Sequence, residues 1–249
     1  MNNIVHSVWT EICSGMLDWL YPPRCCTCRR AWNDRINPCC PSCQALLKDQ
    51  ASNVCPRCAE DRKQVDQNRS DCGACRNASF TFERVLRLGE YQGALQQAVL
   101  QIKQASNEAM AYHLGRLWWL HQQELGHEAN WDVIVPIPIH WTRRVLRGYN
   151  HAEAIAQGIA HGCARKANMH VLRKRRITHR QSELTVAQRQ QNMIKAFTVV
   201  PSARIKGKGI LLVDDVVTTG STAQSATREL KKAGADRVII ACLARSHKD

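Results

Sequence analysis

Long apolar runs are missing from this 249-residue sequence. The opening stretch Ile4–Leu20 has apolar residues at four-residue spacing, but it contains no Lys or Arg. It is interrupted by His6, Glu11 and Asp18, so neither a membrane span nor a secretory signal core is predicted there. Without cationic residues the stretch is poorly suited to a membrane surface. We expect a short helix packed on the body of a cytoplasmic protein.

Acidic residues are scarce relative to basic ones, with 21 Asp+Glu against 35 Lys+Arg and a net charge of +14. The imbalance is local, because residues 141–208 hold 15 basic residues against only Glu153 and Glu183. A solvated basic face is the simplest explanation. Three separate clusters nevertheless favour an anionic partner. These clusters are Arg143/Arg144/Arg147, residues 173–176 with Arg180, and Lys206/Lys208.

Cysteine is abundant, with ten of the 13 cysteines lying between Cys25 and Cys75. Eight of them form four C-x2-C pairs: Cys25/Cys28, Cys40/Cys43, Cys55/Cys58 and Cys72/Cys75. Two such turns supply the four thiolates of a tetrahedral structural zinc site, and without a secretory signal a disulfide framework is the weaker alternative. The sequence predicts a double ribbon with two zinc ions. We expect neighbouring rather than interleaved pairs to share an ion, with Cys26 or Cys39 as alternative ligands.

Strand and helix patterns alternate beyond residue 81, which predicts an α/β domain with a parallel sheet covered on both faces. We expect strands near Arg84–Leu88, Asp132–Pro136, Phe197–Val200, Gly209–Val213 and Arg237–Leu243. We expect helices near Ala94–Gln104, Glu108–Leu125, Asn150–Cys163, Thr185–Met193 and Ser221–Ala233. Trp118 and Trp119 fit a helix core better than a base-stacking platform.

The segment ILLVDDVVTTGST (210–222) joins an apolar strand, two carboxylates and a hydroxyl- and glycine-rich turn that opens a helix. Ligands bind at such carboxyl ends of parallel strands, and backbone N–H groups at a helix start suit a phosphate. Asp214 and Asp215 could instead merely cap the turn. The whole string resembles the phosphoribosyl-pyrophosphate (PRPP) motif of type I phosphoribosyltransferases. That resemblance implies ribose contacts from the acid pair and 5-phosphate contacts from the turn Thr218, Thr219, Gly220, Ser221 and Thr222.

Two further segments resemble phosphoribosyltransferase elements. Residues 132–156 are similar to the pyrophosphate-loop region of amidophosphoribosyltransferases, which implies pyrophosphate contacts for Arg143, Arg144 and Arg147. Residues 173–197 look like a mobile basic lid, with Arg180 and Gln181 as closing residues that exclude water.

Together these motifs resemble the competence protein ComF family over essentially the full length. The shared segments are LDWLYPPRCC, the ribbon cysteines, EYQGALQQAVLQIK, VPIP with RGYNHAE, T-x2-Q-x2-L with R-x2-N and AF, and LLVDDVVTTGST. We expect a helix at 1–22, a double zinc ribbon at 23–78 and a type I phosphoribosyltransferase-like domain at 82–249. Relatives commonly have a lysine followed by a small basic or glycine run. Here Lys103 is followed by Gln, Ala and Ser, which puts any role of Lys103 in doubt.

The resemblance implies a cytoplasmic protein of natural competence or DNA utilisation that binds PRPP with Mg²⁺, acts on single-stranded DNA and meets DNA-uptake proteins. Trp141, Tyr149 or Phe197 would stack on bases, although aromatics are sparse in the basic segment. The alternative is an active phosphoribosyltransferase of nucleotide metabolism with an unknown acceptor, in which Asp214, Asp215 and Arg180 would serve catalysis. Thr218 occupies a position that is typically aspartate in purine-salvage relatives, which argues against purine salvage. A regulatory role is a third option.

Overall fold

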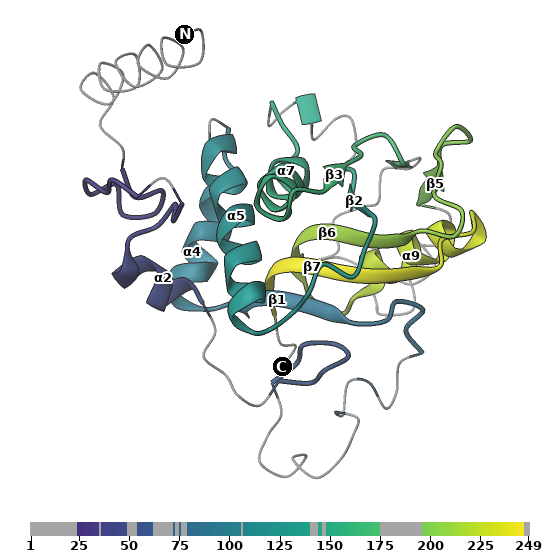
Figure 1. Cartoon of the computed structure of the whole chain (residues 1–249), viewed down its shortest axis with the longest axis horizontal. Helices are drawn as coiled ribbons and strands as arrows, with labels where there is room; N and C mark the ends of the chain where they lie inside the picture. Colours follow the sequence, from purple (N-terminus) through teal and green to yellow (C-terminus); the bar gives the residue numbers. More distant parts are fainter. Residues whose placement is uncertain are drawn as a thin grey trace, which may run out of the picture.

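Five parallel strands form the central sheet, in the order β1-β7-β6-β2-β3 (Figure 1). The computed structural model describes residues 24–34, 36–48, 54–61, 72, 75, 79–105, 107–139, 144–145, 148–174 and 196–246. The strands are Val85–Glu90 (β1), Val133–Pro136 (β2), Lys166–Ala167 (β3), Gly209–Val217 (β6) and Arg237–Arg245 (β7). The central strands β6 and β7 are almost continuously apolar because both of their faces are covered.

Helices cover both faces of the sheet, as the sequence predicted. They are Gly93–Gln101 (α4), Glu108–Glu124 (α5), His151–Cys163 (α7) and Ser221–Lys232 (α9). Side chains alternate along β6, so that Leu211 and Val213 join the core with α4, α5 and α7. Ile210 and Leu212 join a second core with α9. Figure 1 shows α5 and α7 on one side of the sheet and α9 on the other.

Two glycines set the close crossing of α5 and α7. A Cβ at Gly115 would lie 2.2 Å from the carbonyl oxygen of Ile155, and a Cβ at Gly158 would lie 1.9 Å from that of Tyr112. Any larger residue would therefore push the two helices apart. The crossing fixes the start of α7, which carries part of the candidate site.

A second, two-stranded antiparallel sheet pairs Leu172–Lys174 (β4) with Phe197–Val199 (β5). The sequence predicted the strand at Phe197 but placed it in the parallel sheet, and that placement was wrong. Leu172 and Phe197 are buried against the α9 side of the core, so the pair covers the sheet rather than extending it. Strand propensity indicates that a segment is extended, but it does not indicate which strand the segment pairs with.

Other expectations are confirmed, or lie outside the described residues. Trp118 and Trp119 are buried in the core, and Trp118 Nε1 donates to the Leu86 carbonyl at 3.3 Å. The helices expected at Ile4–Leu20 and Thr185–Met193 lie outside the described residues, and the domain bounds remain predictions. Among the described helices, none is long and apolar enough to cross a bilayer.

Candidate functional site

The two ribbons begin with the same backbone knuckle. In the first, Cys25 N donates to the Arg30 carbonyl at 2.9 Å, and in the second, Cys55 N donates to the Glu60 carbonyl at 2.7 Å. An antiparallel bridge closes each turn, between Arg24 and Ala31 and between Val54 and Asp61. Arg29 and Ala59 each have positive φ, 59° and 55°, at the same position of the turn. The repeated C-x2-C spacing therefore gives a repeated local structure.

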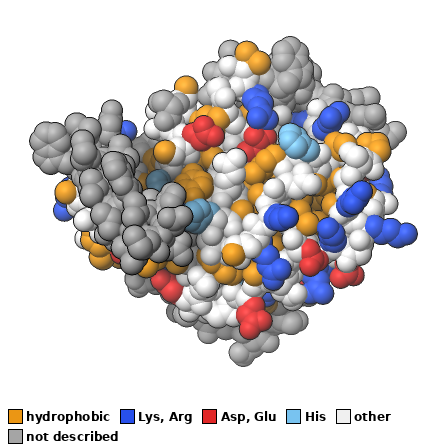
Figure 2. Space-filling model, turned by 45° about the horizontal axis from the view of Figure 1, so that its top comes forward, with side chains coloured by type: hydrophobic (Ala, Val, Ile, Leu, Met, Phe, Trp, Pro, Cys, Tyr) orange, Lys and Arg blue, Asp and Glu red, His pale blue; other side chains and the backbone are white. Residues whose placement is uncertain are grey.

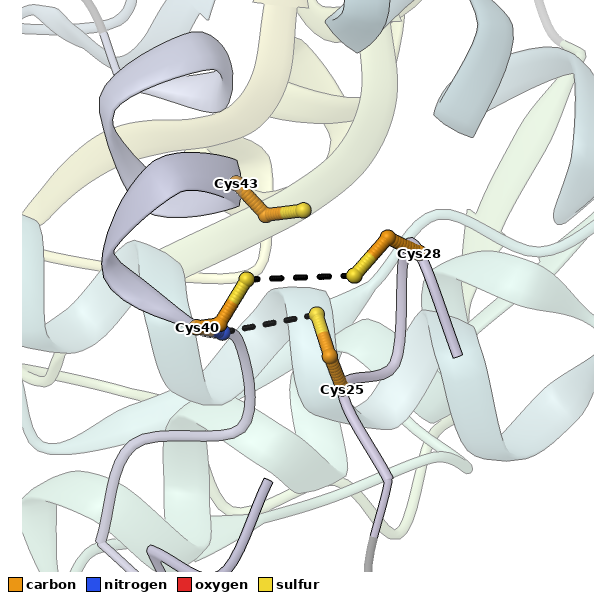
Figure 3. A group of neighbouring side chains, drawn as sticks. All are labelled: Cys25, Cys28, Cys40 and Cys43. Atoms are coloured by element: carbon orange, nitrogen blue, oxygen red, sulfur yellow. Dashed lines mark hydrogen bonds between the residues drawn. The ribbon is translucent and has the colours of Figure 1, made fainter. Parts of the chain in front are cut away.

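Each knuckle faces a second cysteine pair, so that the structure contains two four-thiol clusters. In each cluster the four sulfur atoms lie within 4.8 Å of one another. The clusters are Cys25/Cys28/Cys40/Cys43, shown in Figure 3, and Cys55/Cys58/Cys72/Cys75. Cys43 lies on the short helix Pro41–Leu47 (α2). Four thiols in a closed set suit tetrahedral structural zinc, and each cluster consists of the neighbouring pairs that were predicted to share an ion.

Backbone N–H groups favour the thiolate form of one cysteine in each knuckle. The Arg30 backbone N–H lowers the pKa of Cys28 to about 6. Burial raises the pKa of Cys55, but the N–H groups of Cys58 and Arg57 outweigh it and lower that pKa to about 7. Because the thiolate is the form that binds metal, one thiol of each knuckle is suited to zinc near neutral pH, whereas burial raises the pKa of Cys43, Cys58 and Cys75.

Cys26 and Cys39 stand outside the first four-thiol cluster. Their sulfur atoms lie 2.8 Å apart, and Cys39 is fully buried. The side chain of Cys26, followed by burial, raises the pKa of Cys39 well above its usual range. The four sulfur atoms of Cys25, Cys28, Cys40 and Cys43 already form a closed cluster, so neither residue is needed to complete the site.

The candidate ligand site lies where β6 approaches its carboxyl end. The strand was predicted to stop at Val213, but it continues through the acid pair to Val217. Side chains on neighbouring strand positions point to opposite faces, so Asp214 is half-buried while Asp215 is buried. Neither carboxylate caps α9, whose N-cap residue is Gly220. The capping alternative for this acid pair is therefore wrong.

Asp215 is fixed through both carboxylate oxygens. Its Oδ1 accepts from Val216 N at 2.8 Å. Its Oδ2 lies 3.0 Å from Lys103 Nζ and 3.3 Å from His151 Nε2. These two side chains come from the segment after α4 and from the first residue of α7, so three distant parts of the chain meet at one carboxylate.

The two aspartates differ in their electrostatics. Burial raises the pKa of Asp215, but the hydrogen bond and charge of His151, together with the charge of Lys103, hold it below its usual range. Burial, and then the negative charge of Asp215, raise the pKa of Asp214 well above its usual range. Asp215 is therefore held in its charged form. A cation bound beside Asp214 would stabilise the charged form of that carboxylate.

The start of α7 is positioned by its N-cap residue. The side chain of Asn150 accepts from Ala152 N at 3.1 Å and donates to the Ile137 carbonyl at 3.2 Å. One side chain thus caps the helix and ties it to the segment after β2. His151, the next residue, is held against Asp215 as a result.

The turn after β6 has the geometry of an anion-binding site. Thr218 and Thr219 are exposed, and Gly220 has φ 73°, a conformation that favours glycine. Thr219 Oγ1 lies 3.1 Å from Ser221 Oγ and accepts from Ser221 N at 3.4 Å. These hydroxyls and the first N–H groups of α9, whose 12 residues begin at Ser221, point to an anionic ligand.

Comparisons with known proteins agree with this arrangement. Residues 101–249 match the phosphoribosyl transferase domain model and residues 16–76 the double zinc ribbon domain model. The DNA utilization protein YhgH of Salmonella typhi is 31% identical over 182 residues, which cover 70% of this chain and 78% of that protein. Competence protein F of Haemophilus influenzae is 27% identical over 184 residues, with the same coverage. The chain belongs to the family of competence protein F (ComF).

A solved structure also resembles part of this ComF-family chain. The glutamine PRPP amidotransferase of B. subtilis matches 55% of the chain at 22% identity, with a TM-score of 0.38. The match spans only 26% of that enzyme. The double zinc ribbon and the parallel sheet flanked by helices confirm the predicted fold class.

The structure brings together some of the predicted ComF site residues. Asp214, Asp215 and the five turn residues are continuous along β6 and α9. Of the basic residues, Arg144 is described, and its Nη1 lies 2.8 Å from Glu153 Oε1. Arg143, Arg147, Arg180 and Gln181 lie outside the described residues, so their roles remain predictions.

Sequence reasoning missed both partners of the Asp215 carboxylate. It set Lys103 aside because the following residues depart from the ComF pattern, and it assigned no role to His151. A histidine directly after an N-cap Asn, at the start of a helix that follows a strand, was the available signal. The stacking role suggested for Tyr149 and Phe197 was wrong, because both are buried and the Tyr149 hydroxyl donates to the Ile102 carbonyl.

Proposed function

We propose that this chain binds PRPP or a related phosphoribosyl ligand at the end of β6 and holds single-stranded DNA on its basic surface, in natural competence or DNA utilisation. The observation that carries the first part is the acid pair beside the Gly220 turn. Its carboxylates do not cap the helix, and Lys103 and His151 hold one of them in place. The acid pair suits the vicinal hydroxyls of a sugar, and the turn suits an anion. A ribose 5-phosphate carries both groups.

In this proposal the residues divide by chemistry. Asp214 and Asp215 bind the ribose hydroxyls, and Thr218–Thr222 bind the 5-phosphate. Mg²⁺ suits the donor set, because carboxylate oxygens are its preferred protein ligands, and a cation beside Asp214 would offset the burial and the charge of Asp215 that raise its pKa. Bound there with PRPP, Mg²⁺ would neutralise the diphosphate. Arg143, Arg144 and Arg147 would contact the same diphosphate.

The DNA part of the proposal rests on charge that a single small ligand does not need. Figure 2 shows Lys and Arg side chains gathered on one side of the visible face. Arg173 on β4 is exposed, as are Arg204 and Lys206. The names of the relatives, competence protein F and DNA utilization protein, agree with a nucleic-acid partner. Positive charge with few accessible aromatics predicts salt-sensitive, sequence-tolerant binding.

An active phosphoribosyltransferase is the second candidate. Arg180 would then close over the bound ligand, and catalysis would consist mainly of positioning and charge neutralisation. Thr218 is exposed in the turn, but its hydroxyl cannot serve as a general base at neutral pH. An acceptor that brings its own nucleophilic nitrogen or amine would not depend on Thr218 as a base.

Calorimetry with PRPP and Mg²⁺ tests the sugar site. We expect Asp214→Asn and Asp215→Asn each to weaken binding at least about tenfold, comparable to losing one charged hydrogen bond. Asp132→Asn is the matched control, because Asp132 accepts from Gly209 N at the opposite end of β6. No heat from the wild-type chain would sink the PRPP proposal.

Filter binding of single-stranded DNA over a salt series tests the second part. Affinity should fall steeply with salt, and Lys206→Ala should lower the slope by about 0.7, the share of one single-strand phosphate contact. A flat salt response would reject the electrostatic mechanism. Repeating the series with PRPP shows whether one ligand changes affinity for the other.

A further inference from the structure

The second ribbon lies on the sheet beside the candidate ligand site. Val85 N at the start of β1 donates to the Arg57 carbonyl of the second knuckle at 2.8 Å. Val54 and Ala59 pack into the core that contains α9 and the strand faces beneath it. The knuckle therefore covers part of the α9 side of the sheet over β1.

Two buried arginines of the sheet hold this knuckle. Arg87 on β1 is 6% exposed and donates to the Ala59 carbonyl at 2.7 Å, and it also pairs with Asp61. Arg245, the last residue of β7, is 4% exposed and donates through Nε to the Cys58 carbonyl at 3.1 Å. A buried guanidinium requires such partners, so the knuckle and the sheet fold as one unit.

Arg245 also reaches the ligand site. Its Nη1 donates to the carbonyl of Val217 at 3.0 Å, while its Nη2 lies 2.6 Å from Glu60 Oε2. Val217 ends β6, and the next residue is Thr218, the first of the anion-binding turn. One rigid guanidinium therefore joins the carbonyl of a zinc ligand, Cys58, to the carbonyl that precedes the turn.

The segment that follows the second ribbon, residues 79–82, also packs against the turn that begins at Thr218. The rings of Phe80 and Phe82 stack at 4.6 Å between centroids, and a Cβ at Gly220 would lie 3.4 Å from the Phe80 ring. Gln224 in the first turns of α9 donates to the Ser79 carbonyl at 2.8 Å and accepts from Thr81 N at 2.8 Å. Residues 79–82 therefore contact the turn and α9 directly, whereas the knuckle is connected to the turn through Arg245.

We infer that the second zinc ribbon is a built-in part of the phosphoribosyl site, with Arg245 as a positioning residue that holds the anion-binding turn against the zinc knuckle. The inference rests on the proposed function, because the ligand it concerns is the phosphoribosyl group. Occupancy of the second zinc site and binding of PRPP are thermodynamically linked, so each stabilises the other. The first ribbon lies on the opposite, α4 side and has no share in this linkage.

Calorimetry with PRPP and Mg²⁺ on two matched variants tests the positioning role. Arg245→Lys keeps the charge near Glu60, but an ammonium group cannot span the carbonyls of Cys58 and Val217 at once. We expect about a tenfold loss of affinity with zinc still at two per chain. Arg87→Lys makes the same change in the arginine that holds the knuckle through Ala59, and its affinity should stay within about twofold of the wild type.

Zinc release to a chromogenic chelator gives a second readout. PRPP would not change this release if the second ribbon had only a structural role. PRPP with Mg²⁺ should slow the release of one zinc ion and leave the other unchanged. A variant lacking the first site, Cys25→Ser with Cys28→Ser, should retain one zinc ion whose release shows the full effect. This measurement also covers the case in which Arg245→Lys fails to fold, because it uses wild-type sheet residues.

The outcomes separate the two proposals. Absence of heat from the wild-type chain would overturn the proposed function, and the linkage with it. Wild-type heat with equal affinities for Arg245→Lys and Arg87→Lys would overturn the linkage alone. So would a ligand that binds but slows the release of both zinc ions or of neither.

Discussion

The two zinc ribbons share a knuckle and differ in what surrounds it. The first is attached to the helical layer through α2, where Cys43 and Leu47 are buried with residues of α4. Its polar links to that layer are exposed, as in the pair between Lys48 and Glu124. The second is attached through Arg87 and Arg245, both buried.

This difference separates local structure from function. The same C-x2-C turn makes the same metal site wherever it occurs, but its neighbours decide whether the metal matters elsewhere. An exposed ion pair contributes little and can be lost at modest cost. A knuckle that satisfies buried guanidinium groups cannot leave without stranding charge in the core.

The largest difference between the two ribbons should appear when each zinc site is removed in turn. Cys55→Ser with Cys58→Ser should lower the free energy of unfolding by at least about 3 kcal/mol, because the buried arginines lose their partners. Cys25→Ser with Cys28→Ser also removes one zinc ion but leaves both arginines paired, so its cost should be smaller. Denaturant unfolding with zinc analysis measures both, and equal losses would contradict the distinction.

A single carboxylate of the second ribbon should have nearly as large an effect. Asp61→Ala leaves the buried guanidinium of Arg87 without its ion pair, and we expect a loss of about 3 kcal/mol. Asp61→Asn, which keeps an acceptor, should recover part of this loss in the same unfolding experiment. Asp61→Ala within about 0.5 kcal/mol of wild type would show that the buried pair does not hold the ribbon.

The corresponding pair of the first ribbon should contribute little. Lys48→Met should cost at most about 1 kcal/mol, because Glu124 is 57% exposed and solvent screens the pair. Burial raises the pKa of Glu124, but the Lys48 hydrogen bond and charge outweigh it and lower that pKa. The contribution is therefore present above the unfolded pKa of about 4.3 and is lost as pH falls through the lower folded value. Unfolding measured from pH 7 to pH 3 in both proteins should show the difference disappear.

The smallest effect should come from the extra cysteines. Cys26→Ser should leave zinc at two per chain, because the four ligands of the first site are complete without it. Zinc analysis checks this, with Cys28→Ser as the matched variant that should lose metal. A fall to one zinc ion in Cys26→Ser would reopen the ligand assignment.

Most of the fold and part of the site could be predicted from the sequence. The cysteine spacing specified both metal clusters, and the apolar run with Asp214 and Asp215 located the end of β6. The prediction that this strand stops at Val213 was wrong, because hydrophobicity alone marks the buried stretch and ladder hydrogen bonds continue past it. The place of β5 was wrong for a related reason, since the pattern shows an extended segment but not its partner.

The sequence by itself determined what is encoded over a few neighbouring residues: the zinc ligands, the alternation of strands and helices, and the acid pair before a glycine turn. Only the tertiary structure decided which distant groups meet. Lys103 and His151 converge on Asp215, and Arg245 joins the second knuckle to Val217. These contacts depend on long-range packing, because a buried charge takes its partners from whatever the folded sheet and helices bring within hydrogen-bond distance.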